Sequence, residues 1–369
     1  MERGRARDLG VVIGTYPTGP RNFVTDVQGV RVGHATVVRD PGHDGAGAVR
    51  TGVTTLFPHE GLPWIERVYA GTHVLNGFGE LIGTNQIAEW GLLHSPIVMT
   101  SSLAIGRAYD ATVRWRTLRH DTTTHEGGDM PFVCECDDSY LSDVRSFPLS
   151  EEDVFAALDA AAPGDVAEGC VGAGTGTQCM DFKGGVGTSS RAVPGGWTVG
   201  ALVLTNFGER ELLRIDGVPV GREITDLMPG DHSEGSAIVV VATDVPMVPH
   251  QVRRLAVRGG LGLARCGSTG HNGSGELMIA FSTANRIPLQ SEDGTVAVRA
   301  VLDGPTPDSP DVYNPLFAAT VEAVEEAVVN ALFTAETTVG RDGHVLHALP
   351  LDRTFEILAR HGRGPGSTT

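Results

Sequence analysis

Lysine is almost absent from this sequence of 369 residues, in which Lys183 is the only lysine and every other basic residue is arginine or histidine. A general preference for arginine explains most of that bias, whereas a position that needs a compact ammonium would explain Lys183 itself. Both interpretations stay open. Basic residues are also scarce overall, with 28 Lys and Arg against 45 Asp and Glu and a formal net charge of -17. Nucleic acid is therefore not an expected partner, because phosphate backbones bind basic surfaces.

Long apolar runs are missing too, and no stretch is long enough to cross a bilayer. The apolar stretch Val11-Val12-Ile13 near the N-terminus is much shorter than the core of a secretory signal, so we expect no membrane association and a cytoplasmic location. The five cysteines are odd in number, and only Cys134 and Cys136 lie close together. This spacing predicts reduced thiols rather than a disulfide framework.

Several familiar active-site motifs are absent. No Gly-Lys pair exists for a phosphate loop, no serine has the flanking glycines of GxSxG, and HExxH does not occur. The glycine-rich segment 172–191 is followed by no helical pattern, which disfavours a dinucleotide site and favours close backbone packing beside a pocket. We expect surface positions for four histidines in polar surroundings, namely His120, His125, His344 and His347. No metal and no organic cofactor are expected.

The patterns that are present predict alternating strands and helices. β-branched runs predict strands over 30–38, 52–57, 97–101, 198–205, 237–243 and 277–282. Helical periodicity predicts helices over 103–118, 154–161, 250–264, 316–333 and 351–360. Because the order is irregular and no linker separates two cores, the expected fold class is α/β or α+β, with sheets covered by helices in a single domain over 1–369. Residues 304–314 are expected to form a surface loop.

The stretch GHNGSGELMIAFST, residues 270–283, places a turn sequence directly before an apolar strand. By itself Asn272-Gly273-Ser274-Gly275 is most often an ordinary turn. Its position between an arginine-rich helix and a buried strand would also suit a chain that is cut before Ser274. The cut would expose the serine hydroxyl as a nucleophile and a new α-amine, with a pKa of about 8, as its base. Gly273 would tolerate the strain that brings the hydroxyl onto the preceding carbonyl.

Further segments match this interpretation, among them NFVTDVQGVRVGHATV, NGFGELIGTNQIAEWGLLHSPIVMT, PFVCECDDSYLSD, GAGTGTQCMDFKGGVGTSSR and NPLFAATVEAVEEAVVNALFTAETTVGRDG. Over nearly its whole length the sequence resembles the self-processing L-aminopeptidase/D-esterase type of enzyme, peptidase family S58, which includes the β-peptidyl aminopeptidases. The resemblance implies a four-layer αββα sandwich similar to the N-terminal-nucleophile (Ntn) hydrolases, with its own connectivity. It also implies cleavage between Gly273 and Ser274 into fragments 1–273 and 274–369 that stay associated, and a tetramer of processed pairs.

The same resemblance assigns roles to single residues. Ser274 would be the nucleophile, and Asn206 would donate its side-chain amide to the oxyanion, although a strand-end cap is the ordinary role of such an asparagine. Glu135 would receive the free ammonium of the substrate, and Tyr140 would close the same pocket. The segment 222–236, which includes Asp231-His232-Ser233-Glu234, resembles an insertion that would reshape this pocket.

The last long helix carries the remaining candidates. Glu325 or Glu326 would orient the nucleophile or its amine, and only one of the pair is expected to face inward. Glu322 lies one turn before Glu326 and would share its face. Thr320 is a possible replacement for a family serine expected near this glutamate.

The sequence therefore predicts a serine aminopeptidase that removes N-terminal residues from small peptides, amides or esters with a free N-terminus. Two alternatives stay open: an amidase or acyltransferase with the same processing, of the pantetheine hydrolase or ornithine acetyltransferase type, and an uncut binding protein without activity. The ornithine acetyltransferase type uses threonine as its nucleophile, so Ser274 argues against it.

Overall fold

The computed structural model describes residues 2–42, 46–120, 130–230, 235–304 and 311–365. Two large mixed sheets lie at its centre. The first sheet has the order β1 (Arg31–Arg39), β2 (Val49–Phe57), β6 (Ile97–Ser101), β7 (Phe132–Cys136) and β4 (Leu81–Ile82). The second has the order β10 (Val186–Val193), β11 (Trp197–Asn206), β12 (Ser236–Thr243), β13 (Gly275–Pro288), β3 (Glu66–Gly77) and β5 (Leu92–Leu93). Two parallel pairs, β6–β7 and β12–β13, occur among otherwise antiparallel neighbours.

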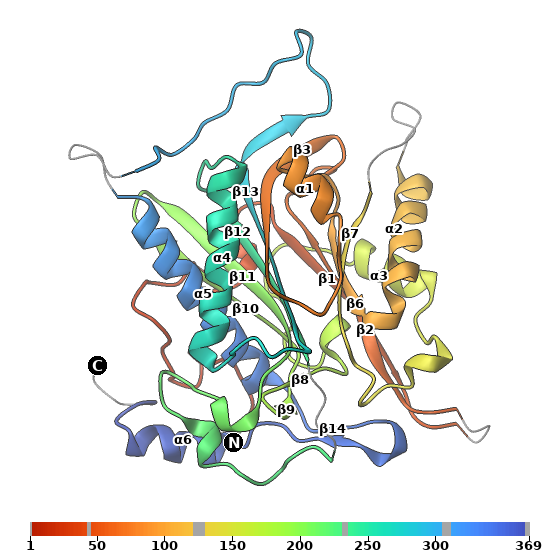
Figure 1. Ribbon diagram of the computed structural model, residues 1–369, viewed down its shortest axis with the longest axis vertical. Coiled ribbons are helices and arrows are strands. Elements are labelled where there is room, and N and C mark those ends of the chain that lie inside the picture. The colour runs from red at the N-terminus through yellow and green to blue at the C-terminus, as the bar shows by residue number, and fades with distance from the viewer. Residues whose placement is uncertain (1, 43–45, 121–129, 231–234, 305–310, 366–369) are drawn as a thin grey trace.

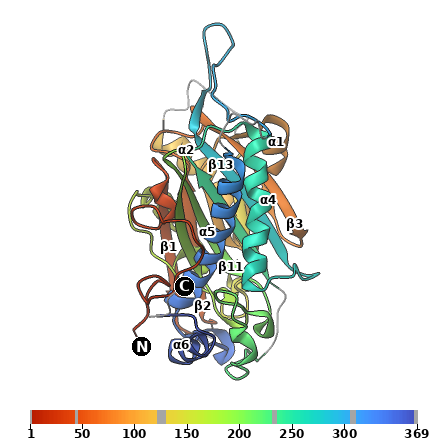
Figure 2. The same cartoon turned by 90° about the vertical axis from the view of Figure 1, so that its left-hand side faces the viewer.

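Helices cover the outer face of each sheet (Figure 1). On one side α2 (Ile105–Arg119) and α3 (Glu151–Asp159) pack on the first sheet, and on the other α4 (Pro249–Cys266) and α5 (Tyr313–Thr334) pack on the second. Figure 2 looks at the second helical layer and shows α4 and α5 running alongside each other. The four layers confirm the predicted αββα sandwich.

The remaining elements are short. They are α1 (Thr84–Trp90), α6 (Leu351–Arg360), the hairpins β8 (Gln178–Cys179) with β9 (Phe182–Lys183) and β14 (Thr338–Val339) with β15 (Val345–Leu346), and 3-10 turns at Val24–Asp26, Ser102–Ala104, Val144–Ser146, Gly172–Gly174, Arg210–Leu212, Val220–Arg222 and Arg341–Gly343. Residues 289–303, after β13, project from the body in both views (Figures 1 and 2). Residues 305–310 of the expected loop lie outside the described residues, and α5 already begins at Tyr313.

Three apolar clusters separate the layers. Val53 and Trp115 belong to the cluster between the first sheet and its helices, and Met99 and Leu277 belong to the cluster between the two sheets. Leu255 belongs to the cluster beneath α4 and α5. The strand β12 and residues 277–281 of β13 are buried on both faces and form almost continuous apolar runs, as expected for strands that are covered on both sides.

Strand pairing brings distant parts of the chain to the same end of the central strands of the second sheet. In the register of β11 with β12, Asn206 lies opposite Ser236, and in that of β12 with β13, Ser236 lies opposite Gly275. The end of β11 and the start of β13 are therefore separated only by β12. Asn206 and Ser274 thus lie at the same end of the central strands.

Candidate active site

Ser274 leaves a tight turn and enters the buried strand β13. Its N–H donates to the carbonyl of His271 at 2.9 Å, which closes the turn, and the residue is only 2% exposed. Gly273 is absent from the residues with positive φ, and the left-handed residue of this loop is Gly270, with φ of 67°. The role expected of Gly273 stays a prediction. A side chain on Gly275 would meet the carbonyl oxygen of Phe78 at 2.6 Å, so the strand start requires glycine.

Asn76 holds the carbonyls of this turn, a role that sequence reasoning missed. Its Nδ2 donates to the carbonyl of His271 at 2.5 Å and to that of Ser274, which also accepts the N–H of Phe78 at 3.3 Å. The carbonyls of His271 and Ser274, which lie on either side of the bond expected to be cut, are thus anchored to β3 and the residue after it. The signal was weak, since Asn76 opens a segment that resembles the family but carries no catalytic motif of its own.

The hydroxyl of Ser274 has a second unexpected partner. Its Oγ donates to Oε1 of Glu276 at 2.6 Å, and the glutamate is 1% exposed. Burial raises the pKa of the Glu276 carboxyl, while the hydrogen bond from Ser274 opposes that rise. Residues two apart on a strand point to the same side, which is the signal that sequence reasoning overlooked.

Asn206 ends β11 with its amide held in one orientation. Oδ1 accepts the N–H of Gln178 at 3.0 Å, and the residue is buried. With the oxygen turned toward Gln178, the Nδ2 group of the same planar amide faces the other way. The side-chain oxygen of Asn206 therefore accepts a backbone N–H, as expected for a strand-end cap. Its Nδ2 group points away from Gln178.

Lys183 supports that arrangement from within the glycine-rich segment. The ammonium is fully buried and donates to the carbonyls of Gly174, Thr177 and Gly184 at 2.9, 2.9 and 2.8 Å. Burial is the main cause that lowers the pKa of its ammonium. The Thr177 carbonyl belongs to the same peptide group as the Gln178 N–H that binds Asn206. Three converging acceptors suit a compact ammonium better than a planar guanidinium, which favours the sharper interpretation of this lysine.

Glu135 lies at the end of β7 with both carboxylate oxygens engaged. Oε1 accepts the N–H of Glu80 at 2.9 Å, and Oε2 accepts the hydroxyl of Ser102. A Cβ on Gly79 would stand 3.3 Å from Oε1 of Glu135 and 3.5 Å from Cα of Gly275. The carboxylate of Glu135 and Gly275, the residue after Ser274, therefore flank the same glycine, which places Glu135 near the start of β13.

The thiols beside Glu135 are inert components of the core. Cys134 and Cys136 are buried and free, and burial raises the pKa of each thiol well above its usual value. Among the residues that the structure describes, no group of three or more His, Cys, Asp or Glu side chains is arranged to hold a metal ion. No described helix combines the length and apolar character needed to span a membrane.

Tyr140 contacts the segment that resembles an insertion. Its hydroxyl accepts the N–H of Gly230 at 2.9 Å, and its ring stacks on His344 with centroids 4.6 Å apart. No hydrogen bond joins Tyr140 to Ser274 in the described part of the chain, so a closing role would act through residues 222–230. Asp231-His232-Ser233-Glu234 lie outside the described residues.

Glu325 and Glu326 are both buried, so the expectation that only one would face inward is wrong. Glu325 pairs with Nε of Arg265 on α4 at 2.8 Å, and burial raises the pKa of its carboxyl to about 7. Glu326 accepts from Nη2 of Arg191 at 2.6 Å and from Nε of Arg7 at 3.0 Å. Neither carboxylate contacts Ser274 within the described ranges.

Two neighbours on α5 complete this group. Glu322 also pairs with Arg191, at 3.3 Å, so it shares a face with Glu326 as expected. Its carboxylate additionally accepts the N–H groups of Thr15 and Tyr16 at 2.9 and 3.0 Å. The hydroxyl of Thr320 donates to the carbonyl of Leu316 at 2.7 Å and is thereby used within its own helix. Glu322 and Glu326 therefore bind the N-terminal segment and Arg191 on β10, whereas Glu325 binds α4.

The histidines expected at the surface have mixed environments. His120 is half-buried against Trp64 and Trp115, with ring centroids 4.9 and 5.0 Å apart, so a plain surface position is wrong for it. His344 and His347 are half-buried. His125 lies outside the described residues.

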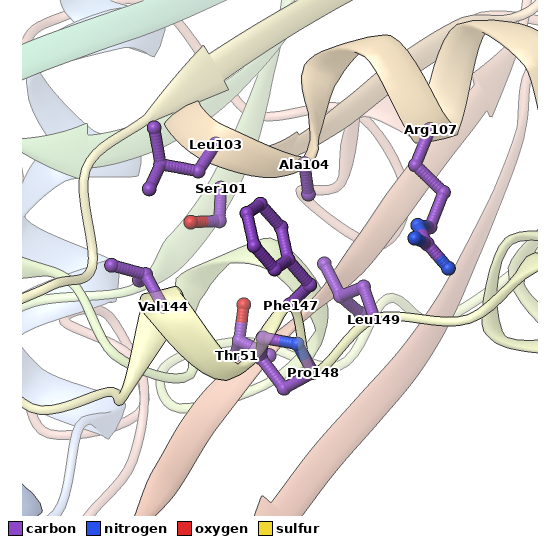
Figure 3. A pocket seen from close by; sticks show the side chains of 9 residues that line it. All are labelled: Thr51, Ser101, Leu103, Ala104, Arg107, Val144, Phe147, Pro148 and Leu149. Atoms are coloured by element: carbon purple, nitrogen blue, oxygen red, sulfur yellow. The ribbon is translucent and has the colours of Figure 1, made fainter.

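A small pocket lies beside the start of α2 (Figure 3). Its lining is mainly apolar and consists of Thr51, Ser101, Leu103, Ala104, Arg107, Val144, Phe147, Pro148 and Leu149. Ser101 donates to the buried Asp138 at 2.7 Å. None of the predicted site residues lines this pocket, so it is not the candidate active site.

Comparison with known proteins gives consistent matches over nearly the whole chain. Residues 22–346 match Peptidase family S58. The β-peptidyl aminopeptidase BapA of Sphingosinicella microcystinivorans is 39% identical over 385 residues, which cover 98% of this chain and 93% of the relative. The structure of a Burkholderia sp. β-aminopeptidase has a TM-score of 0.90 at 40% identity, covering 98% of this chain and 100% of the other. The L-aminopeptidase D-Ala-esterase/amidase of Ochrobactrum anthropi, described as a variant of the Ntn hydrolase fold, has a TM-score of 0.89 at 42% identity and coverages of 97% and 99%.

Proposed function

The chain belongs to peptidase family S58 and is a serine-type aminopeptidase, so we propose that it cleaves itself between Gly273 and Ser274 and then uses Ser274 as its nucleophile. The observation that carries this proposal is the position of Ser274, which follows a closed turn at the start of the central strand β13. Asn206 lies at the same end of β11, and only β12 separates the two strands. The Ser274 hydroxyl attacks the substrate carbonyl, and the α-amine freed by cleavage takes its proton. The amine or alcohol of the substrate leaves, and water then releases the acyl group.

Asn206 is proposed to stabilise the oxyanion. Its Oδ1 accepts the N–H of Gln178, which leaves Nδ2 as the donor. The peptide group between Thr177 and Gln178 is in turn held by Lys183, which donates to the Thr177 carbonyl. A preorganised donor of this kind accelerates acyl transfer because it needs no reorganisation as charge develops. Thus the lysine acts through Asn206 and touches no substrate.

Glu135 is proposed to bind the free ammonium of the substrate. Its carboxylate is ordered by Glu80 and Ser102 and lies across Gly79 from the residue after Ser274. A charged carboxylate that keeps an acceptor site for an ammonium favours substrates with a free N-terminus. Tyr140 is proposed to bound the same pocket through the segment that it anchors at Gly230.

The α5 glutamates have a less direct role in this proposal. A contribution of Glu325 or Glu326 to the orientation of Ser274 stays a prediction. Their arginine contacts favour an indirect effect, in which α5 fixes α4 and the N-terminal segment around the sheet.

Cleavage would give fragments 1–273 and 274–369 that remain one folded unit. In the second fragment, β13 is hydrogen-bonded to β12 on one side and to β3 on the other, and both neighbours belong to the first fragment. Its α5 also packs on β10 and β11. Separation of the fragments would expose this continuous core, so a single domain over 1–369 persists after the cut.

The hydrolytic function is favoured over the transferase and binding alternatives because the relatives with about 40% identity are aminopeptidases. The substrates proposed are small peptides, amides and esters, and the relatives make β-peptides a class to test beside α-peptides. A tetramer of processed pairs and a cytoplasmic location stay predictions. The exposed Val296, Val298 and Leu302 on the projecting segment support contact with another copy of the chain.

Aminoacyl p-nitroanilides test this function directly. An α-aminoacyl anilide, its β-amino counterpart and the N-acetylated form of each are compared on the wild-type chain and on Ser274→Ala. We expect turnover of at least one free anilide, no turnover of the acetylated forms, and no activity in the variant. Equal rates on free and acetylated anilides would refute the assignment of Glu135, and full activity of Ser274→Ala would refute that of the nucleophile.

A further inference from the structure

The uncut chain requires a base that the processed enzyme does not. After cleavage, the α-amine of Ser274 can accept a proton from its own hydroxyl. Before cleavage, that nitrogen belongs to the peptide bond and its N–H donates to the carbonyl of His271. Some other group must therefore take the hydroxyl proton while Oγ attacks the Gly273 carbonyl.

Glu276 has the position that this step requires. Its Oε1 accepts a hydrogen bond from Ser274 Oγ at 2.6 Å, and both residues are buried. Its other oxygen, Oε2, has no hydrogen-bond partner in the described part of the chain. One oxygen of the Glu276 carboxylate thus accepts a hydrogen bond from the nucleophile, while Oε2 takes part in no hydrogen bond among the described residues.

Few charged groups of the described residues lie near Glu276. The loop before β13 brings His271 near enough to interact with the carboxylate, and Nε2 of His271 lies 3.8 Å from Glu209. A Cβ placed on Gly270 would stand 3.8 Å from Oε2 of Glu276 and 4.0 Å from Cδ2 of Leu75, so Gly270 and the apolar Leu75 lie on the Oε2 side. Within the described ranges no arginine or lysine pairs with Glu276, and burial makes its carboxylate more basic than an exposed one, which suits a proton acceptor.

We propose that Glu276 is the general base of self-cleavage, an inference that rests on the proposed cut before Ser274. Glu276 takes the Oγ proton as Oγ bonds to the Gly273 carbonyl carbon, and it returns that proton to the Ser274 nitrogen as the C–N bond breaks. The products of this step are an ester between Gly273 and Ser274 Oγ and a free α-amine. Water then hydrolyses the ester to the Gly273 carboxylate and the Ser274 hydroxyl. In the processed enzyme the α-amine serves as base for substrates.

The test follows cleavage of full-length chains made by pulse-labelled cell-free synthesis, with fragments 1–273 and 274–369 quantified over time. Wild type, Ser274→Ala and the matched amide Glu276→Gln are compared. We expect rapid cleavage in wild type, none in Ser274→Ala, and cleavage slowed at least about 100-fold in Glu276→Gln. Glu276→Gln should lower the rate of self-cleavage far more than it lowers kcat of the cut chains on an aminoacyl anilide, because the α-amine has replaced the carboxylate as base.

Two further variants separate the base from a structural role. Glu276→Asp and Glu276→Asn shorten the side chain equally, but only the first keeps a carboxylate. We expect the aspartate chain to be cut at least about tenfold faster than the asparagine chain. Equal rates in this pair, or wild-type cleavage of Glu276→Gln, would overturn the role of Glu276 while leaving self-cleavage intact. A wild-type chain that stays whole would instead overturn the proposed function itself.

Discussion

Replacement of Lys183 by methionine tests the link between the glycine-rich segment and Asn206. Methionine has a similar length and fills the same space, but it donates no hydrogen bond. The carbonyls of Gly174 and Thr177 would keep weaker partners in the Thr177 hydroxyl and the Gly184 N–H, at 3.3 and 3.1 Å. The carbonyl of Gly184, by contrast, loses the 2.8 Å bond from the ammonium.

The expected magnitude follows from these three contacts. A buried carbonyl left without a partner costs about 1–3 kcal/mol, and loss of one of two acceptor bonds costs about 1 kcal/mol. Release of the buried ammonium offsets part of this sum, so we expect the free energy of unfolding to fall by roughly 3 kcal/mol. Lys183→Arg should be no better, since a planar fork does not fit three converging carbonyls.

Urea unfolding in a Ser274→Ala background measures this change on a chain that cannot be cut. In the processed enzyme, the same substitution should lower kcat about tenfold with little change in KM, since Asn206 loses part of its support but still reaches the substrate. A Lys183→Met chain with unfolding free energy within about 0.5 kcal/mol of its parent and unchanged kcat would refute the proposed support.

Three further substitutions address other parts of the site. Asn206→Ala should lower kcat about 100-fold to 1000-fold with KM nearly constant, measured by steady-state kinetics on an aminoacyl anilide, and an unchanged kcat would exclude it as oxyanion donor. Glu135→Gln should raise KM for free-amine substrates about 10-fold to 100-fold, and an unaltered KM would exclude the ammonium site. The raised pKa of Glu325, about 7, means that its contribution to stability is present below pH 4.5 and is lost as pH rises through 7. Glu325→Gln should therefore be more stable than wild type at pH 8, by at most about 3 kcal/mol, and equal to it near pH 4. Thermal melting at both pH values measures this difference, and a variant less stable than wild type at pH 8 would contradict the prediction.

Strands with strongly apolar sequences were predictable, and those with polar sequences were not. The run over 97–101 coincides with β6, and the helix predicted over 351–360 coincides with α6. In contrast, β10 contains Thr188, Ser189, Ser190 and Arg191, yet nearly all of it is buried. Its polar groups are satisfied by partners remote in sequence, such as the Ala323 carbonyl for Ser189, and hydrophobic periodicity carries no information about them.

The candidate site was predictable where a single residue carried its own chemical signature. Ser274 stands out from its turn and its strand, and the family resemblance pointed to Asn206 and Glu135. The partners that orient them come from pairing across the sheet, as with Asn76 beside the turn and Gln178 beside Asn206. The environment of the α5 glutamates was not predictable, because helical periodicity cannot reveal the arginines supplied by β10 and the N-terminal segment.

The mass of the purified chain tests the central claim, that Ser274 is both the site of the cut and the nucleophile. Intact-mass spectrometry of wild type beside Ser274→Ala, after equal incubation, should give the two fragments 1–273 and 274–369 in the first and one unbroken 369-residue chain in the second. A single unbroken mass in wild type, or a cut at Gly273 in the variant, would contradict it.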